Sequence, residues 1–275
     1  MTFTIALAQL EVAQYDIDAN VAKAEEHIRQ AVGAGAELVV FPEDFVTGVG
    51  AEMTKYADAD GAYRETFRKL AAKYAVDLVP GSWLEREGGR FFNTAYYVDR
   101  AGEVLARYRK VHLWLSEKPF ATPGDGPAVA ATRFGTVGLA ICWDLAFPEL
   151  FRQMFHQRCD IVVCPSCWCL EDAGTGRRHN PRAEQLLIDS SCTARAFENE
   201  MAVVFCNVAG RWNGSRGPCT SAGHTQVAVP FVGPAAMLEH NQEAVLLHEV
   251  DTAILADAEQ SYEIKKDLLD GGAGA

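Results

Sequence analysis

The sequence contains no run of about eighteen or more apolar residues, the length that a membrane-spanning helix requires. Basic residues are also scarce: 25 Lys and Arg stand against 37 Asp and Glu, which gives a formal net charge of −12. A nucleic-acid-binding protein needs a basic face to displace counterions from phosphates. We therefore expect neither a membrane nor a nucleic acid as a partner. The first residues lack the basic segment of a signal peptide and alternate like a strand, so we expect a cytoplasmic protein.

Cysteine, by contrast, is abundant, with eight residues in the chain. Reduced thiols are the rule in the cytosol, so we expect no disulfide framework. The segment Cys164–Cys169 ("CPSCWC") contains a CxxC, but a structural zinc site requires four ligands, and no second pair follows at a suitable spacing. We predict no metal and no cofactor, and we interpret these cysteines as small packing residues in a strand and the turn after it.

Strand-like and helix-like periodicities alternate along the chain. Strands are predicted at 4–12, 37–41, 77–83, 91–99, 102–113, 136–141, 160–165 and 201–208, with short strands through 223–250. Helices are predicted at 20–35, with Asn20 as N-cap, and at 62–75, 147–157 and 181–199. The segments 91–99 and 102–113 predict an antiparallel hairpin. Together these elements predict one α/β domain over residues 1–265, followed by a flexible tail at 266–275.

Cys142 stands where an apolar strand ends and a helix begins, with Pro148 at the expected first helical position. Unpaired backbone N–H groups at such a bend favour a thiolate, and the N–H of Trp143 is placed to hold an oxyanion. A buried structural thiol is the alternative, and the bend alone does not decide between them.

Two charged residues stand at comparable positions. Glu43 follows the buried strand "LVVF" and a proline, and Lys110 lies among apolar neighbours in the predicted strand 102–113. Each has a structural explanation when taken singly, as a solvated acid or an edge charge. Together with Cys142 they supply a base, a cation and a nucleophile, all at sheet positions.

With these three residues the chain resembles the nitrilase superfamily of carbon–nitrogen hydrolases. The resemblance includes Glu43 in "FPED", Lys110 in "RKVHL" and Cys142 in "ICWDLAFPELFR". It extends to "ATPGD", "VVCPSCW", "ARAFENEMAVVFCN" and "GHT", in that order, so it covers nearly the whole chain. It implies a four-layer α-β-β-α sandwich whose subunits pair through their helical layers, as a homodimer or a higher homo-oligomer.

The resemblance also implies roles for individual residues. Cys142 acts as nucleophile, Glu43 as general base, and Lys110 as the cation beside the tetrahedral intermediate, so that an acyl-enzyme thioester forms and is hydrolysed. A second glutamate of the family corresponds to Glu117 in "SEKPFATPGD", where it positions the lysine and the substrate. The alternative for Glu117 is an exposed loop acid paired with Lys118.

Further residues are candidates for substrate binding. Trp143 and Trp168 are expected to form an apolar wall of the pocket. Arg177 and Arg178 are expected at its rim, where such a pair can hold a substrate carboxylate through two parallel hydrogen bonds. His112 lies two residues beyond Lys110, and we interpret it as hydrogen-bonded packing support rather than a catalytic group.

The predicted activity is hydrolysis of a small amide, with release of ammonia and a carboxylic acid. An N-carbamoyl (ureido) amidohydrolase and a nitrilase are alternatives that use the same three residues. A soluble acyltransferase, in which an amine replaces water, and a non-catalytic binding protein are more distant ones. Fold resemblance alone does not name the substrate.

Overall fold

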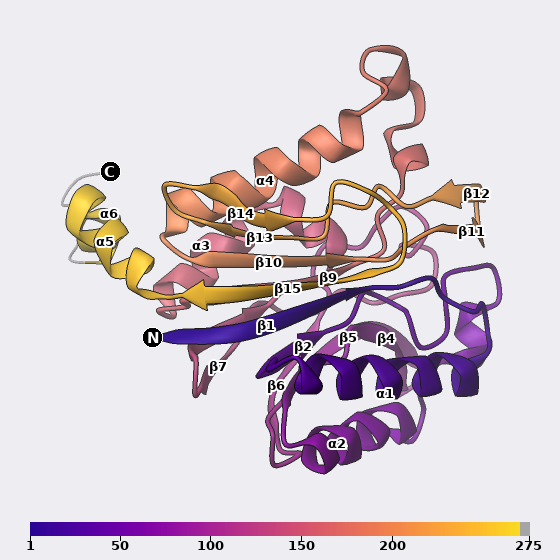
Figure 1. Ribbon diagram of the computed structural model, residues 1–275. Coiled ribbons are helices and arrows are strands. Elements are labelled where there is room, and N and C mark those ends of the chain that lie inside the picture. The colour runs from indigo at the N-terminus through magenta and orange to yellow at the C-terminus, as the bar shows by residue number, and fades with distance from the viewer. Residues whose placement is uncertain (270–275) are drawn as a thin grey trace.

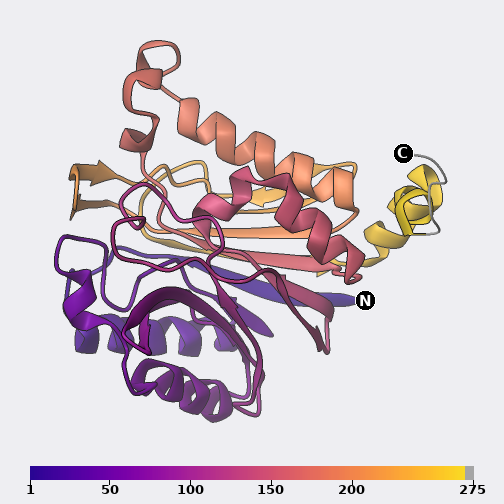
Figure 2. The same cartoon turned by 180° about the vertical axis from the view of Figure 1, so that it is seen from behind.

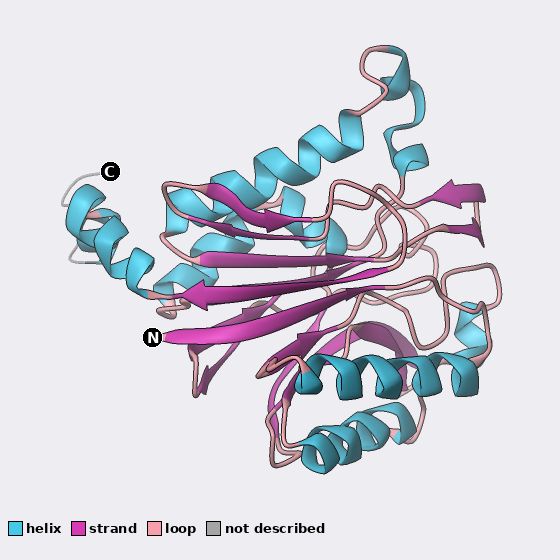
Figure 3. Ribbon diagram, viewed as in Figure 1, coloured by secondary structure: helices cyan, strands magenta, loops and turns pink. Residues whose placement is uncertain are grey.

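Two stacked β-sheets form the centre of the molecule, which is described here by a computed structural model covering residues 1–269 (Figure 1, Figure 3). The first sheet has the order β15-β1-β2-β3-β5-β4, with β6 paired to β5, and the second has the order β14-β13-β10-β9-β8-β7. The first contains β1 (Thr2–Gln9), β2 (Leu38–Val40), β3 (Asp77–Val79), β4 (Ser82–Glu87), β5 (Arg90–Val98), β6 (Val104–Arg109) and β15 (Ala244–Asp251). The second contains β7 (Ala128–Thr132), β8 (Gly135–Leu139), β9 (Ile161–Ser166), β10 (Ala202–Asn207), β13 (Gln226–Val229) and β14 (Gly233–Met237).

Helices cover the outer faces of both sheets. α1 (Ile17–Gly33) and α2 (Ala62–Tyr74) lie against the first sheet, whereas α3 (Pro148–His156) and α4 (Ala183–Asn199) lie against the second (Figure 1, Figure 2). The smaller elements are a separate hairpin, β11 (Arg211–Gly214) and β12 (Gly217–Thr220), and the 3₁₀ segments η1 (Met53–Tyr56), η2 (Cys142–Ala146) and η3 (Leu170–Arg178). The predicted four-layer α-β-β-α sandwich is therefore confirmed.

The alternation along the strands explains the layers. Ile5 and Leu7 of β1 pack between the two sheets, whereas Ala6 and Ala8, one residue later each time, pack beneath α1 and α2. Successive side chains of a strand point to opposite faces, so a strand buried on both faces is apolar at nearly every position. This is why the N-terminal segment reads as a continuous apolar strand.

Several predicted boundaries differ from the structure, by a few residues or by a break within the element. α1 begins earlier than expected, because Asp16 is the N-cap and accepts a hydrogen bond from the Ala19 N–H, whereas Asn20 is buried within the helix. The predicted strand 77–83 is divided into β3 and β4 at Gly81, which has a φ of +70° and lies so close to the Pro42 carbonyl that a Cβ would stand 2.0 Å from it. The predicted strand 102–113 ends with β6 at Arg109.

The chain finishes in two short helices, α5 (Ala253–Tyr262) and α6 (Ile264–Leu269). The predicted tail, 266–275, therefore overlaps α6 up to Leu269, and its remaining residues lie outside the described ones. None of the helices within residues 1–269 has the length and apolarity needed to cross a bilayer.

Candidate active site

The ends of three strands bring the predicted nucleophile, base and cation together. Glu43 follows β2, Lys110 is the first residue after β6, and Cys142 follows β8 and opens η2. The Lys110 Nζ lies 2.8 Å from Glu43 Oε1 and 2.7 Å from Glu117 Oε2. Glu117 is therefore a buried partner of Lys110 rather than an exposed acid paired with Lys118.

Cys142 occupies a sharp bend between strand and helix. Its φ is +46°, a left-handed conformation that only a few per cent of non-glycine residues adopt. Asp144 holds this bend: its Oδ2 accepts from the Ile141 N–H at 3.0 Å and from the Tyr108 hydroxyl at 2.7 Å. In this conformation Cys142 lines the cavity described below, and its neighbours maintain the left-handed backbone.

Asp144 is a functional-site residue that sequence reasoning did not identify. Its side chain is fully buried and its Oδ1 accepts from the His112 backbone N–H and lies 2.9 Å from the His112 Nδ1. The His112 ring also stacks on Phe147, with 3.7 Å between ring centroids. His112 thus supports the bend at Cys142 (called the elbow below) through its contact with Asp144 and through packing on Phe147, and it does not line the cavity.

Asn93 on β5 is the second unanticipated member of the site. Its amide Nδ2 donates to Glu43 Oε1 at 2.9 Å and to Glu117 Oε1 at 2.8 Å, so one side chain bridges the two acids. Asn is disfavoured inside a strand. A buried asparagine between Phe92 and Thr94 was the available sequence signal for a polar role.

Glu43 is oriented by hydrogen bonds to both of its oxygens. Lys110 and Asn93 occupy Oε1, while Oε2 accepts from the Cys167 backbone N–H at 2.9 Å. A carboxylate oxygen has two lone pairs, so Oε2 retains one for a further proton. The Cys142 thiol is close enough to this carboxylate to lower its pKa slightly, against the larger effect of burial. Glu43 is therefore placed to accept the proton of the thiol.

Burial sets the protonation states of the site. It raises the pKa of Cys142 well above its ordinary value, and Glu43 raises it further, against the opposing effect of Lys110. Burial also raises the pKa of Glu43, with Lys110 opposing and Glu117 adding to the rise. Burial lowers the pKa of Lys110, but Glu117, Glu43 and Cys142 outweigh it, so that this pKa lies well above its usual range. The raised pKa of Cys142 thus favours a neutral thiol in the free site, whereas the bend alone favoured a thiolate.

A cavity of about 410 Å³ opens in front of Cys142. Its wall is largely apolar and includes the predicted Trp143 and Trp168, whose ring centroids lie 5.5 Å apart. Within the CPSCWC segment, Cys164 is packed in β9 as predicted, but Cys167 and Cys169 line this cavity. The volume suits a small molecule of several heavy atoms.

Arg177 and Arg178 are not among the residues that line the cavity. Both are exposed on η3, and an Arg177 guanidinium nitrogen lies 3.5 Å from Glu171 Oε1. The arginine that does line the cavity is Arg216, in the turn between β11 and β12. Its position depends on how that hairpin folds over the sheet ends, which no local pattern around Arg216 indicates.

Comparison with known proteins agrees with this geometry. The model of the carbon-nitrogen hydrolase family matches residues 4–260. Omega-amidase NIT2 from Homo sapiens is 29% identical over 275 residues, covering 96% of this chain and 94% of the human one. An amidase from Nesterenkonia sp. superimposes with a TM-score of 0.77 at 26% identity, covering 95% of each chain. A carbon-nitrogen hydrolase from Helicobacter pylori G27 shares the fold, with a TM-score of 0.85 at 22% identity and coverage of 98% and 96%. The protein is thus an enzyme that belongs to the carbon–nitrogen hydrolase family.

Proposed function

We propose that this protein hydrolyses a small amide through a thioester on Cys142, releasing ammonia and a carboxylic acid. The observation that carries the proposal is the Lys110 ammonium, buried between Glu43 and Glu117 beside the Cys142 elbow. Structures of a related amidase support it. A mutant of the Nesterenkonia amidase carries the acetamide moiety of fluoroacetamide on its active-site cysteine, and another mutant binds butyramide.

Acylation begins with proton transfer from the Cys142 Sγ to Glu43. Because burial raises the pKa of this thiol, the base must act as the sulfur attacks. The Sγ–C bond forms, and the carbonyl π electrons move to the oxygen. When the tetrahedral intermediate collapses, the C–N bond breaks and Glu43 returns the proton to the departing nitrogen, which leaves as ammonia.

Lys110 and the backbone N–H of Trp143 stabilise the oxyanion. Lys110 is 1% exposed, and a cation in such a poorly solvated place acts more strongly on developing negative charge than one in water. Glu117 and Glu43 hold the ammonium in place before the substrate arrives. Glu117 therefore acts as a positioning residue, and Asn93 positions it in turn.

Deacylation reverses the proton path. Water enters where ammonia left, gives a proton to Glu43 and attacks the thioester carbon. The C–S bond then breaks, and the proton on Glu43 restores the Cys142 thiol. No cofactor is needed to balance these steps.

Mass spectrometry of a trapped adduct tests this function. Acid quenching during turnover of a panel of amides is expected to leave an acyl group on Cys142, and Cys142→Ala is expected to abolish both the adduct and ammonia release. The panel includes ureides and nitriles of matched chain length, which would be preferred by an N-carbamoyl hydrolase or a nitrilase. Turnover of nitriles alone contradicts the amidase assignment, and an absent adduct with full activity contradicts the thioester.

A further inference from the structure

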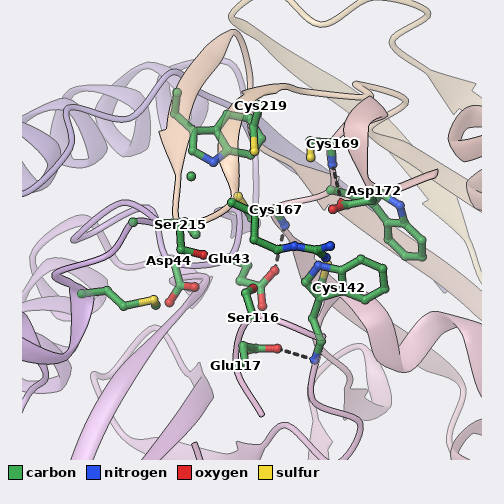
Figure 4. A pocket seen from close by; sticks show the side chains of 18 of the residues that line it. Glu43, Asp44, Ser116, Glu117, Cys142, Cys167, Cys169, Asp172, Ser215 and Cys219 are labelled. Atoms are coloured by element: carbon green, nitrogen blue, oxygen red, sulfur yellow. Dashed lines mark hydrogen bonds between the residues drawn. The ribbon is translucent and has the colours of Figure 1, made fainter. Parts of the chain in front are cut away.

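Asp44 is an acid that lines the cavity, and the proposed reaction steps do not use it. It directly follows Glu43, is 3% exposed, and has a left-handed backbone with a φ of +52°. Three backbone hydrogen bonds impose this conformation: its N–H donates to the Ser82 carbonyl at 2.9 Å, and its carbonyl accepts from Thr47 and Gly48 at 3.3 and 2.7 Å. With the backbone held in this way, the Asp44 side chain lines the cavity in front of Cys142 (Figure 4).

The Asp44 carboxyl group has no hydrogen-bond or ion-pair partner within residues 1–269. Its Oδ1 is buried and unpaired. Glu43 and Glu117, by comparison, are each bound by both Lys110 and Asn93. Buried polar groups in folded proteins are almost always paired, so an unpaired carboxyl group facing a cavity indicates a bound partner that the cavity receives.

The charges around the cavity limit which substrate group can bind the Asp44 carboxyl group. Four acids line the cavity, namely Glu43, Asp44, Glu117 and Asp172, and two of them, Glu43 and Glu117, pair with the buried ammonium of Lys110. Burial raises the pKa of Asp44 well above its usual range, and Glu43 and Glu117 raise it further, against Lys110. This rise favours the protonated form of Asp44, which has an O–H to donate.

This electrostatic setting selects among substrate groups. A carboxylate on the substrate would be repelled by the excess negative charge of the cavity. Arg216 compensates this charge only weakly, because it is exposed to solvent. It also interacts with Asp172 and lowers the pKa of that acid, against the larger effect of burial. A substrate ammonium would require Asp44 to lose a proton between two neighbouring acids. An uncharged oxygen requires neither a compensating charge nor the loss of the Asp44 proton, and it accepts a hydrogen bond from the O–H directly.

We propose that Asp44 is a specificity-determining residue that donates a hydrogen bond to an uncharged oxygen of the substrate, separate from the scissile amide. The preferred substrates are then small amides carrying an ether, keto or hydroxyl oxygen. This inference rests on the amide hydrolysis proposed above, and it adds a second recognition point at the Asp44 side of the cavity.

The test uses uncharged amides of equal heavy-atom count that differ in one position, together with charged analogues of similar size. Pentanamide is compared with methoxypropanamide and ethoxyacetamide, in which an ether oxygen replaces one methylene, and with succinamate and aminobutanamide as the charged analogues. The readout is the ratio of kcat/KM between each ether amide and pentanamide. In the wild type we expect this ratio to exceed unity by about tenfold for one ether position, because the unpaired carboxyl group gains a partner.

Two variants and a pH series separate recognition from structure. Asp44→Leu removes the hydrogen bond at similar shape and is expected to reduce the ratio to about one, whereas Asp44→Asn keeps an N–H donor and retains a preference. In the wild type the ratio is expected to fall as pH rises and Asp44 loses its proton, and Asp44→Asn to lack this fall. This pH series needs no variant to fold.

Each contrary result overturns the proposal on its own. A ratio unchanged by Asp44→Leu, or a preference for succinamate or aminobutanamide that depends on Asp44, excludes the neutral hydrogen bond. Failure of the amide function itself has a different signature, because no amide of the panel would then be turned over by the wild type.

Discussion

The Lys110 Nζ lies 2.8 Å from Glu43 Oε1, although 67 residues separate the two along the chain. Both side chains are almost fully buried, and Glu117 holds the same ammonium from the other side. A buried ion pair is strongly destabilising when one partner is removed, because the remaining charge loses its compensation. We therefore expect Lys110 to contribute both to the proposed catalysis and to the stability of the fold.

Substituting Lys110 is expected to affect both properties. Lys110→Met leaves two buried acids without a cation, so we expect the free energy of unfolding to fall by about 3 to 5 kcal/mol. Loss of oxyanion stabilisation is expected to lower kcat by at least about a hundredfold. Urea unfolding and ammonia release measure the two effects. Lys118→Gln, at an exposed lysine of the same loop, is the control and should change neither.

The pH dependence of turnover should report Glu43. Burial raises the pKa of Glu43 above its ordinary value of 4.5, with Glu117 adding to the rise. Activity requires the unprotonated base, so it is present above this raised pKa and lost as pH falls through it. We expect the acid limb of the kcat/KM profile to lie above pH 4.5 and to vanish with the activity in Glu43→Gln. An acid limb at or below the ordinary value would contradict this base.

Asp144 should act on the turnover rate more than on binding. Its carboxylate holds the Ile141 N–H, the Tyr108 hydroxyl and the His112 backbone, and so maintains the elbow. In Asp144→Asn we expect kcat to fall about a hundredfold with little change in KM, because a small displacement of the sulfur misaligns its attack. Glu149→Gln on the neighbouring helix surface is the control. A matching loss of stability without the split between kcat and KM would indicate a purely structural role.

Selective alkylation distinguishes Cys142 from the other seven cysteines. Iodoacetamide resembles the proposed substrates, fits the cavity and meets a sulfur beside a base. We expect the first modification at neutral pH on Cys142 and a slower one in Glu43→Gln, read by peptide mass spectrometry. Cys219 is the strictest comparison, because it also lines the cavity and its hydrogen bond with Cys169 lowers its pKa. Faster labelling of Cys219 would count against an activated Cys142.

The N-cap of α1 offers a test of stability away from the site. Asp16 accepts from the Ala19 N–H at 3.0 Å, so Asp16→Ala is expected to lower the free energy of unfolding by about 1 kcal/mol. Asp18, also acidic and exposed in the first turn, interacts with the helix dipole alone, and Asp18→Ala should cost about 0.3 kcal/mol. Equal effects would show that Asp16 acts by charge rather than as a cap.

Much of the fold was predictable because it depends on neighbours in sequence. The apolar, strand-like pattern of β1 and the Pro148 that begins α3 are local signals, and both predict elements that the structure contains. The family resemblance similarly identified Glu43, Lys110 and Cys142, whose motifs are short and continuous. Boundaries such as Asp16 or Gly81 were missed, since a cap bond or a close approach to Pro42 is a contact rather than a pattern.

Sequence by itself determined an α/β domain, because periodicity decides the type of each element, and its motifs carried the family resemblance that implied the layered sandwich and the three residues proposed to react. Tertiary structure alone decided which residues surround those groups. Asn93, Asp144 and Asp44 gain their roles from strands and turns that pack together across the sheets, and Arg216 from the folding of a separate hairpin. Long-range packing also explains why Arg177 does not line the cavity, since η3 places it at the surface beside Glu171. Such placements result from long-range packing, in which residues distant along the chain share one desolvated space.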